Sequence, residues 1–119
     1  MSSLTRKQKY KVKTALNFLT LFTLWFVVGH LFAEQLPNIG QKDKNFSVDQ
    51  LAVKVGETVT FTNEDPFFHN VFSLSPAATF DLGSYPQGES RSVTFDEAGV
   101  VHIECAIHPS MQMVIEVAE

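Results

Sequence analysis

The chain has 119 residues and a formal net charge of −4, a length that favours a single domain. The first 33 residues contain five basic residues and no acidic one, whereas residues 34–119 contain all thirteen acidic residues and four basic ones, a net charge of −9. This acidic surface argues against binding to nucleic acid. It favours a partner with a basic docking surface, because surface charge steers encounter.

The N-terminal residues have the layout of an export signal. A basic segment, Arg6 to Lys13, precedes an apolar stretch, Ala15 to Val28, and Ala33 is a small residue suited to the end of a cleaved signal peptide. The apolar stretch is also long enough to cross a membrane if it is not cleaved. We therefore expect residues 1–33 to be a signal peptide or a membrane anchor. Both place the remaining chain outside the cytoplasm, in the periplasm or another extracytoplasmic compartment, because the positive flank stays inside.

The following residues, 34–45, are polar and contain Pro37 and Gly40, and we interpret them as a linker. Hydrophobic and polar residues then alternate with a period of two, which is typical of half-buried strands. Two such runs, residues 51–55 and 58–62, predict a hairpin around Gly56.

Residues 75–88 contain two prolines and two glycines, so we expect mostly loop there. Further strands are predicted at residues 69–74, 90–95, 101–105 and 113–117. No helical period is sustained after residue 33. The pattern therefore favours an all-β fold over residues 46–119, a small Greek-key β-sandwich, preceded by an N-terminal apolar signal or anchor helix.

The segment from Cys105 to Met111 carries the strongest functional signal. It places a thiol, the imidazole of His108 and a thioether within seven positions, and these donors together favour copper over magnesium or calcium. Cys105 is the only cysteine, so it cannot form an internal disulfide, and a free thiol in an exported protein needs something to hold it. With His69 the donors make up the Cys-His₂-Met ligand set of a blue-copper electron-transfer site.

Other residues compete for two places in this set. His30 belongs to the leader, and His102 faces away from Cys105 by strand alternation, which leaves His69 as the second histidine. For the axial thioether both Met111 and Met113 remain open. Met111 is favoured, because Pro109 suits a short loop and the alternation of the last strand places Met113 in the core.

On these residues the chain resembles the cupredoxin (type 1 blue copper) family, which includes amicyanin-, plastocyanin- and pseudoazurin-like proteins. The similarity covers about residues 46–118. The residues that carry it are His69, Asn70, Cys105, His108, Pro109 and Met111. The resemblance implies a cupredoxin-like sandwich that holds one copper ion on His69, Cys105, His108 and Met111.

The resemblance also implies that Asn70 and Pro109 support the site from outside the ligand set. In the family the asparagine stiffens the site by a hydrogen bond to the ligand loop, often to a hydroxyl just after the cysteine. Ala106 has no hydroxyl, which leaves a bond to the backbone as the version that this sequence can make.

The function implied is a one-electron carrier whose partners are redox proteins, such as a c-type cytochrome or a periplasmic dehydrogenase or oxidase. A periplasmic copper-binding, copper-transfer (chaperone-like) protein is the alternative. We do not expect an enzyme, because the Cys–His pair has no accompanying oxyanion-forming motif and a domain this small leaves little room for a substrate cleft. Contact with a membrane is expected only if residues 1–33 are retained.

Overall fold

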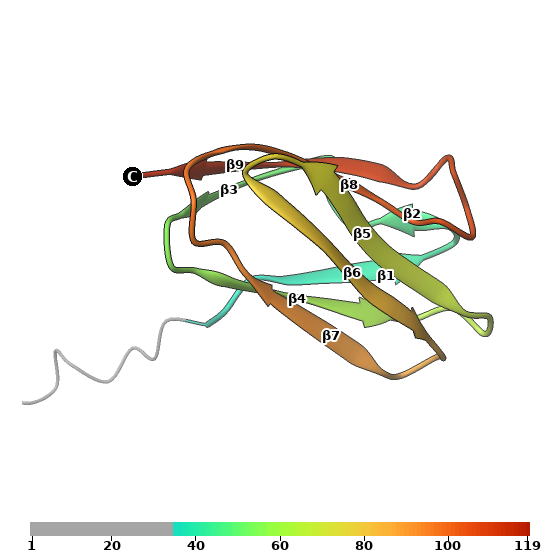
Figure 1. The fold of residues 1–119 in the computed structure, drawn as a ribbon. Helices are drawn as coiled ribbons and strands as arrows, with labels where there is room; N and C mark the ends of the chain where they lie inside the picture. Colours follow the sequence, from blue (N-terminus) through green and yellow to red (C-terminus); the bar gives the residue numbers. More distant parts are fainter. Residues whose placement is uncertain (1–34) are drawn as a thin grey trace, which may run out of the picture. The chain divides into compact units, whose positions relative to one another are not determined.

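The computed structural model of the chain describes residues 35–119, and the predicted signal peptide or anchor, residues 1–33, lies outside the described residues. The described part forms strands arranged in two sheets (Figure 1), so the predicted all-β sandwich is confirmed. Within it we find no helix with the length and hydrophobicity needed to cross a membrane. The strands are β1 Asn38–Lys42, β2 Asn45–Phe46, β3 Gln50–Lys54, β4 Thr58–Asn63, β5 His69–Ser75, β6 Ala78–Tyr85, β7 Ser90–Thr94, β8 Gly99–Glu104 and β9 Gln112–Ala118.

The smaller sheet has the strand order β2-β1-β4-β7 and the larger sheet the order β3-β9-β8-β5-β6. β1 pairs in parallel with β4, and β3 pairs in parallel with β9, while the other neighbours are antiparallel. As a result, the β1–β2 turn, the β4–β5 loop and the β8–β9 loop lie at the same end of the sandwich, on the right in Figure 1. Residues far apart in the sequence therefore meet at this end.

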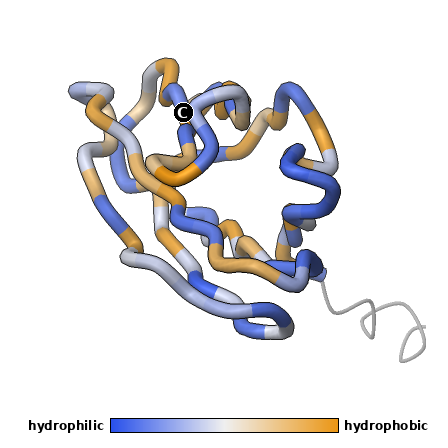
Figure 2. Tube along the Cα trace, turned by 90° about the vertical axis from the view of Figure 1, so that its right-hand side faces the viewer, coloured by the Kyte–Doolittle hydropathy of each residue, from blue (hydrophilic) through white to orange (hydrophobic). Residues whose placement is uncertain are grey.

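The core lies between the two sheets and follows from alternation along the strands. Hydrophobic and hydrophilic residues alternate along the trace in Figure 2. One face of each strand is thereby buried, as expected for sheets that pack face to face. The fully buried side chains include Val59, Phe61, Tyr85, Phe95, Val101, Ile103 and Ile115.

The linker predicted at residues 34–45 is wrong over Asn38–Lys42, which form β1 and pair with β4. Ile39 and Gln41 point inward, and the buried Gln41 side chain accepts a hydrogen bond from the hydroxyl of Tyr85. A buried glutamine in place of an apolar residue hides the alternation, and the run is short. The sequence pattern was therefore too weak to indicate a strand here.

The two alternating runs around Gly56 are strands, but the predicted hairpin between them is wrong. β3 pairs with β9 in the larger sheet, whereas β4 pairs with β1 and β7 in the smaller one. The chain turns at Gly56, whose φ of 91° suits glycine, and crosses between the sheets. Alternation identifies a strand with one buried face, but it does not show which of two facing sheets the strand belongs to, because strands of both sheets alternate in the same way.

The prediction of mostly loop over residues 75–88 is wrong for Ala78–Tyr85, which form β6 at the edge of the larger sheet. β6 pairs with β5, and the register shifts between Asn70 and Phe72 of β5. Gly83, with φ 72°, lies in this irregular part of the strand. The glycine that suggested a loop thus belongs to a bulged edge strand, a common position for glycine in sheets.

Candidate metal centre

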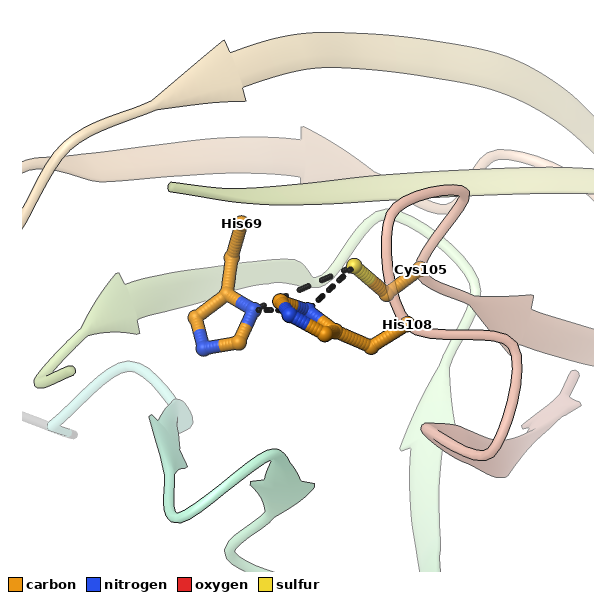
Figure 3. A group of neighbouring side chains, drawn as sticks. All are labelled: His69, Cys105 and His108. Carbon is orange, nitrogen blue, oxygen red and sulfur yellow. Dashed lines mark hydrogen bonds between the residues drawn. The ribbon is translucent and has the colours of Figure 1, made fainter. Parts of the chain in front are cut away.

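Three of the predicted ligand side chains meet at one point (Figure 3). His69 is the first residue of β5, Cys105 follows β8, and His108 lies in the loop between β8 and β9. The Sγ atom of Cys105 lies 3.9 Å from Nδ1 of His69 and 3.8 Å from Nδ1 of His108. The two Nδ1 atoms are 3.2 Å apart. Two chain segments that are separated by more than thirty positions in the sequence thus present three donor atoms to one another.

These separations fit a single metal ion. An ion that binds nitrogen at about 2.0 Å and sulfur at about 2.3 Å can touch three atoms spaced in this way. Cys105 and His69 are buried, while His108 is partly exposed, so the group opens to solvent on one side. A thiol with two imidazoles is a donor set suited to copper.

The short β8–β9 loop is closed by its own backbone. The N–H of Cys105 donates to the carbonyl oxygen of Met111 at 3.3 Å, and the N–H of Met111 donates to the carbonyl oxygen of His108 at 2.9 Å. These bonds fold Met111 back into the protein, where its side chain is 1 % exposed. Pro109 lies between them on the exposed side of the loop. Met113 is also buried, but it lies within β9 opposite Ile103, as part of the hydrophobic core.

A buried carboxylate orients His69. Nε2 of His69 lies 2.8 Å from Oδ2 of Asp65, and both side chains are almost completely buried. Asp65 also accepts the backbone N–H groups of Asp43 at 2.8 Å and Lys44 at 3.1 Å. Because a carboxylate only accepts hydrogen bonds, Nε2–H of His69 points at Asp65, and Nδ1 faces the other donors.

The hydrogen bonds of Asp65 outweigh the cost of its burial. Burial alone would raise the pKa of this carboxyl, but the bonds with His69 and with the backbone of Lys44 and Asp43 lower the pKa below its usual value. Asp43 and Lys44 both have positive φ, so their turn presents two successive N–H groups to the carboxylate. The role of Asp65 is not evident from the sequence. Its only signal was an acidic residue four positions before a predicted ligand histidine.

Asn70 links β5 to the loop that carries Cys105. Its backbone N–H donates to Sγ of Cys105 at 3.4 Å, and its side-chain Oδ1 accepts the backbone N–H of Ala106 at 3.1 Å. The link across the site is therefore made to the backbone, as the missing hydroxyl at position 106 requires. The side-chain Nδ2 donates to Asp81 of β6, a partner that the sequence did not indicate.

The open side of the donor group is surrounded by apolar side chains. The Phe67 ring lies 5.4 Å from the His69 ring and 5.3 Å from the His108 ring, centroid to centroid. Phe68 and Ile107 are both exposed at this end of the sandwich. Partial burial, followed by the nearby His69, lowers the pKa of His108 below its ordinary value, which favours the neutral imidazole that can bind a metal.

His102 lies elsewhere. It is exposed in the middle of β8, on the face of the strand opposite to Val101 and Ile103, as alternation predicts. It belongs to no group of three possible metal-binding side chains among residues 35–119. The cluster at the end of the sandwich is thus formed by the other two histidines of the described chain.

Comparison with known proteins identifies the family. Residues 33–118 match the model of the copper-binding proteins of the plastocyanin/azurin family, and the chain belongs to this family. Copper is thereby confirmed as the family's cofactor, and His69, Cys105, His108 and Met111 are consistent with a type 1 site. Amicyanin from Paracoccus denitrificans is 33% identical over 70 residues, which are 56% of this chain and 53% of that protein. The chain thus spans about half the length of this curated relative.

Solved structures show the same fold. A reduced tryptophan-to-tyrosine variant of amicyanin superimposes with a TM-score of 0.65 and 28% identity over 73% of this chain and 86% of that one. A methionine-to-alanine variant of amicyanin with Cu(I) gives a TM-score of 0.66 and 27% identity over the same shares. A copper-containing nitrite reductase from Thermus scotoductus SA-01 gives 0.67 and 27% identity, but the match covers 71% of this chain and only 23% of that one. The recognition of a cupredoxin from the sequence is confirmed.

We predict that Asp65→Asn weakens both the fold and the metal site. An amide offers one acceptor oxygen, whereas the two carboxylate oxygens accept three N–H groups. At least one of these donors therefore loses its partner beside the buried side chain, at a cost of about 1–3 kcal/mol in the free energy of unfolding. Loss of the group that orients a ligand histidine typically lowers metal affinity by about 10–100-fold. Chemical denaturation of the metal-free protein and a copper titration measure the two effects.

Glu64→Gln is the matched control, because Glu64 is exposed and adjacent in sequence. This substitution should leave the free energy of unfolding and the copper affinity near their wild-type values. Equal behaviour of the two variants would contradict a role for Asp65 in holding His69.

Proposed function

We propose that the chain is an exported one-electron carrier with a single type 1 copper ion bound by His69, Cys105 and His108, with Met111 as the axial ligand. The observation that carries the proposal is the mutual approach of the three donor atoms, within 3.2 to 3.9 Å, from β5 and the β8–β9 loop. Copper supplies a one-electron couple when bound, and the protein's part is to hold the donors in one arrangement.

The surroundings of the proposed ligands favour electron transfer because they restrict movement. The His69 ring is held by Asp65, the Cys105 sulfur accepts the N–H of Asn70, and the loop is closed by backbone hydrogen bonds. Buried, hydrogen-bonded side chains keep their positions when the charge of a bound ion changes. Little reorganisation is then needed for each electron that enters or leaves.

His108 is the proposed route for the electron. It is the most exposed of the three donors, and Phe67, Phe68 and Ile107 provide apolar surface around it. Brief docking of a redox partner can use this surface, while the acidic charge of the domain steers the encounter. The partners that we propose are a c-type cytochrome or a periplasmic dehydrogenase or oxidase, because the predicted export signal would place the chain in the periplasm.

A copper-transfer function is the alternative, and the burial of the site argues against it. Delivery of the ion to another protein needs donors that a partner can reach, whereas Cys105 is 1 % exposed and His69 is fully buried. An enzymatic function is not proposed either. The resemblance to the nitrite reductase covers less than a quarter of that protein and indicates a shared fold.

Addition of Cu(II) to the full chain should give an intense blue or green thiolate charge-transfer band that is absent in Cys105→Ser. The serine variant keeps the size of the side chain but removes the thiolate on which the band depends. Visible absorption and electron paramagnetic resonance measure the result. A colourless complex in the wild-type protein would overturn the proposal.

Competition with a Cu(I) chelator distinguishes an electron carrier from a copper-transfer protein. An electron carrier should retain copper through repeated cycles of reduction and oxidation. Rapid loss of Cu(I) from the coloured protein would support copper transfer instead.

The axial assignment is tested by comparing Met111→Leu with Met113→Leu. The reduction potential of such sites depends on the axial ligand. We expect Met111→Leu to shift the potential by more than about 60 mV, a tenfold change for a one-electron couple. Met113→Leu, an apolar replacement in the core, should shift it much less, and the reverse order would assign the axial position to Met113.

A further inference from the structure

Asp81 makes a contact with the metal-site region that the sequence pattern does not indicate. It lies on β6, at the edge of the larger sheet, where the register with β5 shifts between Asn70 and Phe72. One carboxylate oxygen, Oδ1, accepts the backbone N–H of Gly83 at 2.9 Å and Nδ2 of Asn70 at 2.7 Å. The bulged part of β6 therefore aims this carboxylate at Asn70, as bulges commonly redirect a side chain.

Each of the four polar atoms of Asn70 makes a hydrogen bond. Its backbone N–H donates to Sγ of Cys105, and its carbonyl oxygen accepts from the buried Gln41 side chain at 3.4 Å. At the end of its side chain, Oδ1 accepts from the N–H of Ala106 and Nδ2 donates to Asp81. The amide must point in one direction for both bonds to form, because its two ends differ only in that one accepts and the other donates.

The chemistry of the two partners fixes that direction. A carboxylate only accepts hydrogen bonds and a backbone N–H only donates, so Nδ2 must face Asp81 and Oδ1 must face Ala106. A hydroxyl at position 106 could meet either end of the amide, but this chain has alanine there. The Asn70 amide is therefore held at both ends, by the N–H of Ala106 at Oδ1 and by Asp81 of β6 at Nδ2.

We propose that Asp81 is a positioning residue for the Cys105 loop. Its carboxylate locks the Asn70 amide, and the locked amide holds the N–H of Ala106, next to Cys105. Where it concerns copper this inference rests on the proposed function. The hydrogen bonds between Asp81 and Asn70 and between Asn70 and Ala106 lie within this chain. Their effect on the N–H of Ala106 can be measured without a metal.

Two substitutions separate the position of the carboxylate from its charge. Asp81→Asn keeps an acceptor oxygen in place for Gly83 and Asn70 but removes the charge. Asp81→Glu keeps the charge but moves the carboxylate by one methylene group. Asp96→Asn is the matched control, since Asp96 is exposed in the turn between β7 and β8 and makes no contact with Asn70.

The first measurement is amide hydrogen exchange at Ala106 in the metal-free full chain. We expect exchange about tenfold faster in Asp81→Glu, the effect of losing one hydrogen bond of ordinary strength. Exchange in Asp81→Asn and Asp96→Asn should remain near the wild-type rate. A wild-type exchange rate at Ala106 in Asp81→Glu would overturn the proposal. If exchange were at the same time faster in Asp81→Asn, the charge of Asp81, and not its position, would be responsible.

The second measurement uses the copper-loaded full chain. The thiolate band and the reduction potential should shift in Asp81→Glu and stay near wild type in Asp81→Asn. Equal potential shifts in Asp81→Asn and Asp81→Glu would overturn positioning as the cause. Failure of the wild-type chain to form a coloured copper complex would overturn the proposed function, while the exchange rates at Ala106 would still decide the role of Asp81.

Discussion

The hydrogen bonds of Asn70 are the constraint on which the candidate site depends. The residue is the second of β5. Its backbone N–H donates to Sγ of Cys105, and its side-chain Oδ1 accepts the N–H of Ala106. His69, its neighbour in sequence, is thereby brought to the loop of Cys105 and His108, more than thirty residues further along the chain. Without this link the two halves of the donor set would be joined only through the sheet.

The site is rigid on its inner side and accessible on its outer side. Asp65 ties His69 to the turn at Asp43 and Lys44, and so joins the smaller sheet to the donor group. On the outer side His108 is partly exposed next to Phe67. A buried acceptor without a hydrogen-bond partner destabilises the folded state, so these hydrogen bonds form when the chain folds. The same bonds fix the positions of the metal-binding side chains. The partly exposed His108 is the proposed point of contact for a redox partner.

The sequence predicted the chemistry better than the architecture. The segment from Cys105 to Met111 and the family of the chain could be recognised because several unusual residues occur together at short spacing. Asp65 and Asp81 could not, because a single acidic residue carries no signal until its neighbours in space are known. β1 and β6 were missed for a related reason. A buried Gln41 interrupts one alternation and Gly83 resembles a loop residue, although both are explained by contacts in the folded chain.

The central claim is that the fold arranges the donors before any metal binds. Crystal structures of the full chain, metal-free and loaded with Cu(II), test it most directly. We expect Nδ1 of His69 and Sγ of Cys105, 3.9 Å apart here, to keep their positions within about 0.5 Å between the two states. A metal-free structure in which His69 has left Asp65, or in which the Cys105 loop has moved away from Asn70, would contradict the account.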